Sequence, residues 1–266
     1  MFARSCLSRR SPMVNGRLLS LLPLLAITAM SSGAFSRLQA QVRDARKASA
    51  GIIVPQGNTA QYQLELVSIK ADKIWFAGLG DRDAISLTLQ VFDGSDSGST
   101  VTVLRKIHNG QTLPLDFQRL FGPRRVVGQL QVNGYLTIAH PQKFENMKAA
   151  VKELYEASGA VAETVGSEKK DEDMVLVSKV MKKEQVQKLV VDVSAELMKA
   201  AGRVACGGAN PITISMDNSN TLDLGEINKL AGGAQFKLLS FHKGAQAHSC
   251  FRNIVYDPIS ARIVRK

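Results

Sequence analysis

Apolar and polar residues alternate along several segments in the first half of the chain. In residues 84–92, AISLTLQVF, the aliphatic residues occupy every second position, with serine, threonine and glutamine between them. Residues 61–69 alternate similarly, and residues 100–107 form a further candidate strand after a turn-like segment, DGSDSGS. Because successive side chains of a strand point to opposite faces, this pattern predicts half-buried β-strands. Four to six such strands within residues 51–142 predict an antiparallel β-sandwich or open barrel.

An Asn-Gly pair interrupts a further alternating segment, residues 126–138. Most even positions there are apolar, and Asn133-Gly134 stands in the middle. Both residue types accept the positive φ angles that a type I′ turn requires. The sequence therefore predicts two short strands joined by a two-residue hairpin turn.

The apolar period becomes helical after residue 143. Four apolar residues recur at helical spacing from Phe144 to Leu154, and a longer helix is predicted from Lys183 to about Val204. The apolar stripe of the longer helix consists of Val186, Leu189, Val190, Val193, Leu197, Ala200, Ala201 and Val204. Such a stripe must pack on another element, and Gly207-Gly208 is a suitable end for the helix.

The C-terminal residues mix short elements. Asp223 and Glu226 have the spacing of a capping box, which predicts a short helix that stops at Gly232-Gly233. Asp257-Pro258 predicts a turn. Strands are predicted at residues 212–216, 235–242, 250–256 and 259–264.

The predicted elements amount to an α+β fold. A β-rich domain is expected at residues 51–142. An α+β domain with central helices, one of them long and amphipathic, and a C-terminal mixed segment with a β-hairpin is expected at residues 143–266. Since the long helix needs a surface to cover, the two parts could pack as one unit.

The first 40 residues have the pattern of an export signal. They contain five arginines and no acidic residue, and Leu18–Met30 is an apolar run too short to span a bilayer as a helix. Small residues suit cleavage after Ala34 or after Ala40, and Met13 offers an alternative start. The prediction is a cleaved signal at residues 1–40 and a periplasmic or secreted bacterial protein without a transmembrane span after cleavage.

Two further expectations concern the same end of the chain. Residues 41–50, QVRDARKASA, are polar and small and predict a tail or linker. A mitochondrial presequence is the alternative to export, because residues 1–17 are rich in Arg and Ser and lack acids.

The composition narrows the class of protein. A hydrophobic fraction of 45% argues against a disordered chain. The formal net charge is +11, but it falls to +6 when the five arginines of residues 1–40 are left out. A moderate positive charge argues against a nucleic-acid partner and suits contact with anionic envelope polymers.

Cys206 and Cys250 would remain as a pair once Cys6 leaves with the signal. In an oxidising compartment such a pair predicts a disulfide. Two buried free thiols are the alternative.

Residues 241–250, FHKGAQAHSC, are the segment most like a chemical site. His242, His248 and Cys250 are possible zinc ligands, and a histidine could also activate the thiol as a nucleophile. The spacing H-x5-H-x-C matches no strong zinc template, so these residues are weak metal candidates and no cofactor is predicted. Histidines at a surface hairpin are the plainer interpretation.

Asp93 and Asp96 offer a second, weaker cation site. Together with backbone carbonyls of the same Gly- and Ser-rich turn, the two carboxylates could bind Ca²⁺. A solvated turn is the alternative.

Two groups of basic residues are candidates for partner contact. An exposed partner-binding loop is predicted next to Gly122-Pro123, because a mixture of apolar and basic residues suits a partner surface. This loop comprises Phe117, Arg119, Leu120, Phe121, Arg124 and Arg125. The second group is a basic C-terminal surface of Lys237, Lys243, Arg252, Arg262 and Arg265. Those bases would either dock on an anionic partner or be the solvated side of edge strands.

These observations favour an exported envelope protein that acts by binding. It would be a non-enzymatic structural or accessory component that contacts an envelope polymer or a protein partner. A metal- or thiol-dependent hydrolase centred on His242, His248 and Cys250 is the alternative. The pattern leaves the ligand and the oligomeric state open.

Overall fold

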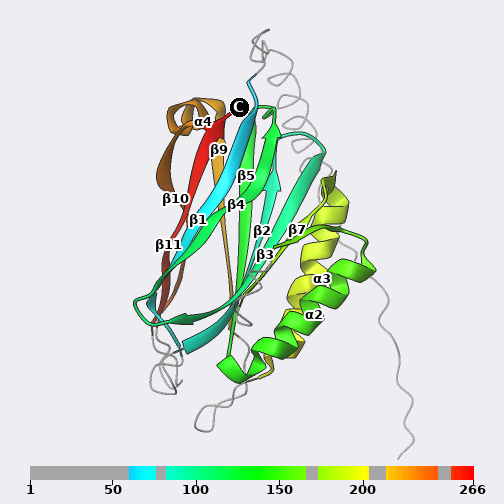
Figure 1. Ribbon diagram of the computed structural model, residues 1–266, viewed down its shortest axis with the longest axis vertical. Helices are drawn as coiled ribbons and strands as arrows, with labels where there is room; N and C mark the ends of the chain where they lie inside the picture. The colour runs from blue at the N-terminus through cyan, green and yellow to red at the C-terminus, as the bar shows by residue number, and fades with distance from the viewer. Residues whose placement is uncertain (1–59, 76–81, 166–172, 204–213, 245–252) are drawn as a thin grey trace, which may run out of the picture. The chain divides into compact units, whose positions relative to one another are not determined.

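The computed structural model describes residues 60–75, 82–165, 173–203, 214–244 and 253–266, which belong to one compact unit (Figure 1). Several predicted features lie outside the described residues: the export signal at 1–40, the tail at 41–50, Cys206, His248, Cys250 and Arg252. The described part consists of two antiparallel sheets and a small number of helices, an α+β content.

Four strands from distant parts of the chain form the first sheet. They are β1 (Tyr62–Lys73), β4 (Thr112–Arg124), β10 (Gly232–Lys243) and β11 (Ile254–Arg265). Their order is β10-β11-β1-β4, and every neighbouring pair is antiparallel. Strands from both sides of residue 142 therefore share one sheet.

Six strands form the main path of the second sheet, in the order β6-β7-β3-β2-β5-β9. They are β2 (Arg82–Phe92), β3 (Ser97–His108), β5 (Gln129–Ala139), β6 (Val161–Val165), β7 (Asp173–Ser178) and β9 (Ile214–Asp223). A short strand, β8 (Met181–Lys182), pairs with the start of β3. All these pairs are antiparallel.

The two sheets pack face to face around one buried apolar cluster (Figure 1). Ile85 and Leu87 of β2 belong to the same cluster as Leu64 and Leu66 of β1. The strand predicted at residues 84–92 is confirmed, and Ile85, Leu87, Leu89 and Val91 face this cluster. Its predicted half-burial is wrong. The opposite side of β2 is buried as well, because a further layer covers it.

Helices cover the outer face of the second sheet (Figure 1). They are α2 (Phe144–Ala157) and α3 (Lys183–Ala201), and they share a second apolar cluster with β2, β3, β5 and β7. The buried residues of α3 are Val186, Leu189, Val190, Val193, Leu197 and Ala201. Within the described part of the chain, no helix has the length and apolar composition needed to cross a membrane.

Two short helical segments complete the layers. A 3-10 turn, η1 (Pro141–Lys143), precedes α2. The helix α4 (Leu224–Leu230) follows β9 and begins with the predicted capping box. The Glu226 N–H donates to Asp223 Oδ1 at 2.8 Å, and Glu226 Oε2 accepts from the Asp223 N–H at 3.2 Å. Two N–H groups that a helix start leaves unpaired are thereby satisfied.

The predicted hairpin at Asn133-Gly134 is wrong. β5 runs through both residues and pairs with β2 on one side and β9 on the other. Gly134 lies in the core, where an added Cβ would come within 2.6 Å of a Leu239 side-chain carbon and 3.0 Å of the Phe241 ring. The glycine is therefore required by the close approach of the two sheets rather than by a turn.

The predicted turn at Asp257-Pro258 is also wrong, because β11 continues through it. Tyr256 pairs with Ala71, and Ile259 pairs with Ile69. The register with β1 is therefore irregular at the two residues between them, Asp257 and Pro258. An irregularity of this kind lets a strand contain a proline, which cannot donate to the ladder.

Candidate functional site

Six basic residues lie on or next to the strands that meet near the end of β4, a region called the basic end below. It consists of Arg119, Arg124, Arg125, Lys179, Lys182 and Lys183. The fold assembles it from two segments of sequence: Ser97 of β3 pairs with Lys182 of β8, and Arg124 Nη2 donates to Ser97 Oγ at 2.9 Å. Sequence analysis found the three arginines of this group and missed the three lysines, since only the strand pairing brings them there.

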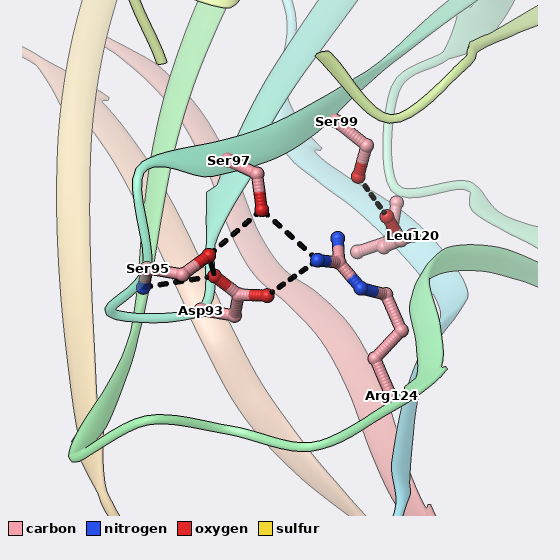
Figure 2. Close-up of polar contacts among 6 residues, drawn as sticks. All are labelled: Asp93, Ser95, Ser97, Ser99, Leu120 and Arg124. Atoms are coloured by element: carbon pink, nitrogen blue, oxygen red, sulfur yellow. Dashed lines mark hydrogen bonds and ion pairs between the residues drawn. The ribbon is translucent and has the colours of Figure 1, made fainter. Parts of the chain in front are cut away.

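Arg124 is held by a buried carboxylate (Figure 2). Its Nη2 lies 3.1 Å from Asp93 Oδ2, and Asp93 is only 2% exposed. The other oxygen, Asp93 Oδ1, accepts from the N–H and the hydroxyl of Ser95. The Ser95 hydroxyl in turn lies 2.7 Å from the Ser97 hydroxyl. Asp93, which the sequence suggested as a Ca²⁺ ligand, is thus paired with the guanidinium of Arg124.

A hollow of about 240 Å³ opens beside this cluster, between β3, β4 and the end of β7. Leu120 and Phe121 contribute apolar lining, and the exposed Arg119 and Lys179 supply its charge. Ser99 Oγ, which also lines it, donates to the Leu120 carbonyl at 3.0 Å and so fixes the β4 backbone (Figure 2). A guanidinium and an ammonium on one hollow can hold a carboxylate or phosphate group by charge-assisted hydrogen bonds.

Acidic residues lie near the basic end as well. Asp93 is paired with Arg124, and Asp96 follows it in the same turn, where its carbonyl accepts from the Lys183 N–H at 3.1 Å. Glu184 lies in the first turn of α3. Glu65 of β1 is the register partner of Arg119, so four acidic residues lie among the six basic residues of this region.

The segment predicted as an exposed partner-binding loop is part of the strand β4. Leu120 and Phe121 lie in β4 and are 2% and 3% exposed, packed in the core between the sheets. Leu64 pairs with Phe121 and Glu65 pairs with Arg119, so Leu120 is an extra residue in β4. A bulge of this kind buries two successive residues, which simple alternation does not anticipate. Arg119 and Arg125 are exposed, as predicted, and Phe117 lies in the same strand.

Gly122 explains why this irregular stretch is not a loop. Its φ is +85°, and a Cβ there would lie 2.1 Å from the Tyr62 carbonyl oxygen of the neighbouring β1. Glycine is therefore needed both for its conformation and for the close approach of the two strands.

Two residues of the predicted basic C-terminal surface are paired with acidic groups. Lys237 Nζ lies 2.8 Å from Asp257 Oδ1, and Arg262 donates to Glu65 at 2.5 Å. Glu65 is on β1, far from the C-terminus in sequence, so a count of charges within the segment missed it. Arg265 is exposed and Lys243 is half-buried.

His242 is the described residue of the predicted His/Cys segment. It is exposed, and its Nε2 lies 3.2 Å from Asp257 Oδ2. Among the residues that the structure describes, no three His, Cys, Asp or Glu side chains are grouped closely enough to hold a metal ion.

Asp83 is a second buried carboxylate, and it lies within the core. Asp83 Oδ2 accepts from the Tyr256 hydroxyl at 2.8 Å and from the Trp75 N–H at 3.0 Å. Burial raises the pKa of Tyr256 well above its ordinary value, and the adjacent Asp83 raises it further. Asp83 and Tyr256 are both 0% exposed, so their contact links β2 to β11 inside the core.

No known family model matches the chain, and no curated protein matches it. The fold itself is that of a two-sheet antiparallel protein with a layer of helices, and Arg119 and Lys179 line the hollow at its basic end.

Proposed function

We propose that this protein acts by binding, as a non-enzymatic structural or accessory component that is exported to the cell envelope. The ligand would be an envelope polymer or protein partner that carries carboxylate or phosphate groups. The observation that supports this most directly is the hollow at the basic end, where Arg119 and Lys179 meet beside the anchored Arg124.

Preorganisation at Arg124 and along the β4 backbone also supports the proposal. Arg124 is fixed by Asp93 and Ser97, and the β4 backbone is fixed by Ser99. Groups that are already positioned lose little conformational entropy when a ligand arrives. The exposed bases around them would raise the local concentration of a polyanion.

The test is binding of the full chain to poly-L-glutamate and to polyphosphate, which present the two anionic groups separately. The variant Arg119→Ala/Lys179→Ala removes both charges from the hollow. Because exposed charges are screened by solvent, we expect affinity to fall about tenfold, with a weaker dependence on salt. The control Arg265→Ala/Lys266→Ala removes the same charge elsewhere and should bind as the unmodified chain does. Equal losses in both variants would mean that net charge alone drives binding.

A hydrolase centred on His242, His248 and Cys250 is the second candidate. The contact between His242 and Asp257 favours it, because a carboxylate can orient a catalytic histidine. Lys237 contacts the same carboxylate, which also fits a surface ion-pair network. Metal analysis and thiol titration of the folded protein distinguish the two candidates: stoichiometric zinc or a reactive thiol would favour the hydrolase.

A further inference from the structure

A groove on the outer face of the second sheet lies apart from the basic end. It consists of two adjoining hollows of about 400 and 510 Å³, both of which are lined by Asn133 and Tyr135. β5 and β9 make its floor, and α3 makes one wall. We call it the β5–β9 groove.

The floor is dense in amide and hydroxyl groups. On the strand pair, Asn133 lies opposite Ser219, and Tyr135 lies opposite Asp217. Side chains directly opposite one another in an antiparallel pair share a face. The floor therefore presents two adjacent rows of hydrogen-bonding groups and one aromatic ring.

Two neighbouring amides, one buried and one half-buried, hold Asn133 in place. Its Nδ2 donates to Gln90 Oε1 at 3.3 Å, and its Oδ1 accepts from Gln131 at 3.2 Å. Gln90 is 3% exposed and donates to the Val186 carbonyl of α3 at 3.4 Å. An amide has two donor hydrogens and two acceptor lone pairs, so Asn133 keeps one of each for a ligand.

The wall contributes apolar surface. Val191 and Met198 of α3 are 66% and 41% exposed, and both line the groove. They are two of the four large hydrophobic side chains exposed in the described part of the chain. Gln187 and Ser194 of the same helix add hydrogen-bonding groups between them.

The charge of the groove excludes a polyanion as its ligand. Of the described residues that line it, Asp217 alone is charged, and it is negative. An extended peptide added as a strand is disfavoured too, because β10 lies beside β9. Asn218 and Asn220 of β9 donate to β10 carbonyls at 2.6 and 2.9 Å.

We propose that the β5–β9 groove binds a neutral oligosaccharide. A pyranose ring has a rim of hydroxyls and faces of C–H groups. The amides and hydroxyls of the floor match that rim, while Tyr135, Val191 and Met198 match the faces. This site goes beyond the proposed function at the basic end and does not depend on it, because the two share no residue.

The experiment is calorimetric titration of the full chain with cellohexaose, chitohexaose, maltohexaose and laminarihexaose. We expect saturable binding of at least one of these neutral hexasaccharides. The variant Tyr135→Ala should weaken it at least tenfold, and Val191→Asp should weaken it several-fold. Because Val191 is exposed, the second variant tests the site even if the first one unfolds.

Two controls make the result specific. Val127→Asp places the same charge on an equally exposed valine outside the groove, and it should leave binding unchanged. Arg119→Ala/Lys179→Ala should also bind the sugar normally, whatever its effect on polyanions. Failure of all four hexasaccharides to bind, or binding that survives both Tyr135→Ala and Val191→Asp, would overturn the proposal.

Discussion

At the scale of single residues, the contact between Asp83 and Tyr256 predicts how stability depends on pH. A tyrosine in an unfolded chain ionises near pH 10. In the folded protein, burial and Asp83 hold the pKa of Tyr256 well above that value, so the unfolded state loses its proton first. The stability associated with this tyrosine is therefore complete below about pH 10 and is lost as the pH rises from there toward the folded pKa.

The variant Tyr256→Phe checks this link. Removing the hydroxyl leaves a buried carboxylate without one donor, which should cost about 1–3 kcal/mol at pH 7. The fall in melting temperature above pH 10 should also become smaller than in the unmodified chain. Burial raises the pKa of Tyr155 as well, so part of the fall in melting temperature above pH 10 will remain in the Tyr256→Phe variant. The half-buried Tyr135, changed to Phe, is the control; an unaltered alkaline fall in Tyr256→Phe would contradict the assignment.

Arg124 gives a second prediction at this scale. Its partner Asp93 is 2% exposed, so Arg124→Ala leaves a buried carboxylate without its cation. We expect a loss of about 1–3 kcal/mol in the free energy of unfolding, measured by urea denaturation. Arg125→Ala changes the neighbouring, exposed arginine and should cost less than about 0.5 kcal/mol. Equal effects would show that the contact with Asp93 contributes little.

At the scale of elements, a substitution at Gly134 distinguishes the observed continuous strand from the predicted hairpin. The close approach of Leu239 and Phe241 leaves no room for a Cβ. Gly134→Ala should therefore destabilise the protein by about 1–3 kcal/mol through overpacking. Gly232, also in a strand, has no atom within 4 Å of an added Cβ, so Gly232→Ala is the matched control. Thermal melting compares them, and a neutral Gly134→Ala would contradict the observed sheet packing.

Local patterns predicted elements well where the relevant neighbours were local. The strand predicted at residues 84–92 and the capping box at Asp223 depend on residues close in sequence, and both are confirmed. The pairs Asn133-Gly134 and Asp257-Pro258 resemble turns locally, but their conformation is set by strands from distant parts of the chain. The same holds for Arg262, whose acidic partner Glu65 is on β1.

At the scale of the whole molecule, the candidate sites follow from topology. Arg119 could be singled out from the sequence, but Lys179 joins it only because β7 and β4 end at one hollow. The β5–β9 groove had no sequence signal, since Asn133 appeared as a turn residue and Ser219 lay beyond the strand predicted at residues 212–216. Residue types can thus be found in the sequence, whereas their assembly into a surface depends on non-local strand pairing.

The disulfide predicted between Cys206 and Cys250 lies outside the described residues, and only the strands that flank the two cysteines can be compared. The bonds from Asn218 to Ser240 and from Asn220 to Leu238 make β9 and β10 run in opposite directions. The start of β9 and the end of β10 therefore lie at the same end of this pair, and Ile254 pairs with Lys243 there. Cys206 precedes Ile214 by eight residues, and Cys250 precedes Ile254 by four. The described strand ends that flank the two cysteines therefore lie at one end of this pair of strands, and the bridge itself stays a prediction.

The intact mass of the protein from its native host, alkylated before and after reduction, tests export and the bridge together. We expect a chain that begins near Phe35 or Gln41 and that takes up alkylating agent only after reduction. A bridge across about 45 residues contributes about 3–4 kcal/mol on the chain-entropy model, so Cys206→Ala/Cys250→Ala should melt well below the unmodified protein. An uncleaved chain with two free thiols would contradict both predictions. That outcome would favour the hydrolase centred on His242, His248 and Cys250, because a thiol nucleophile must be free.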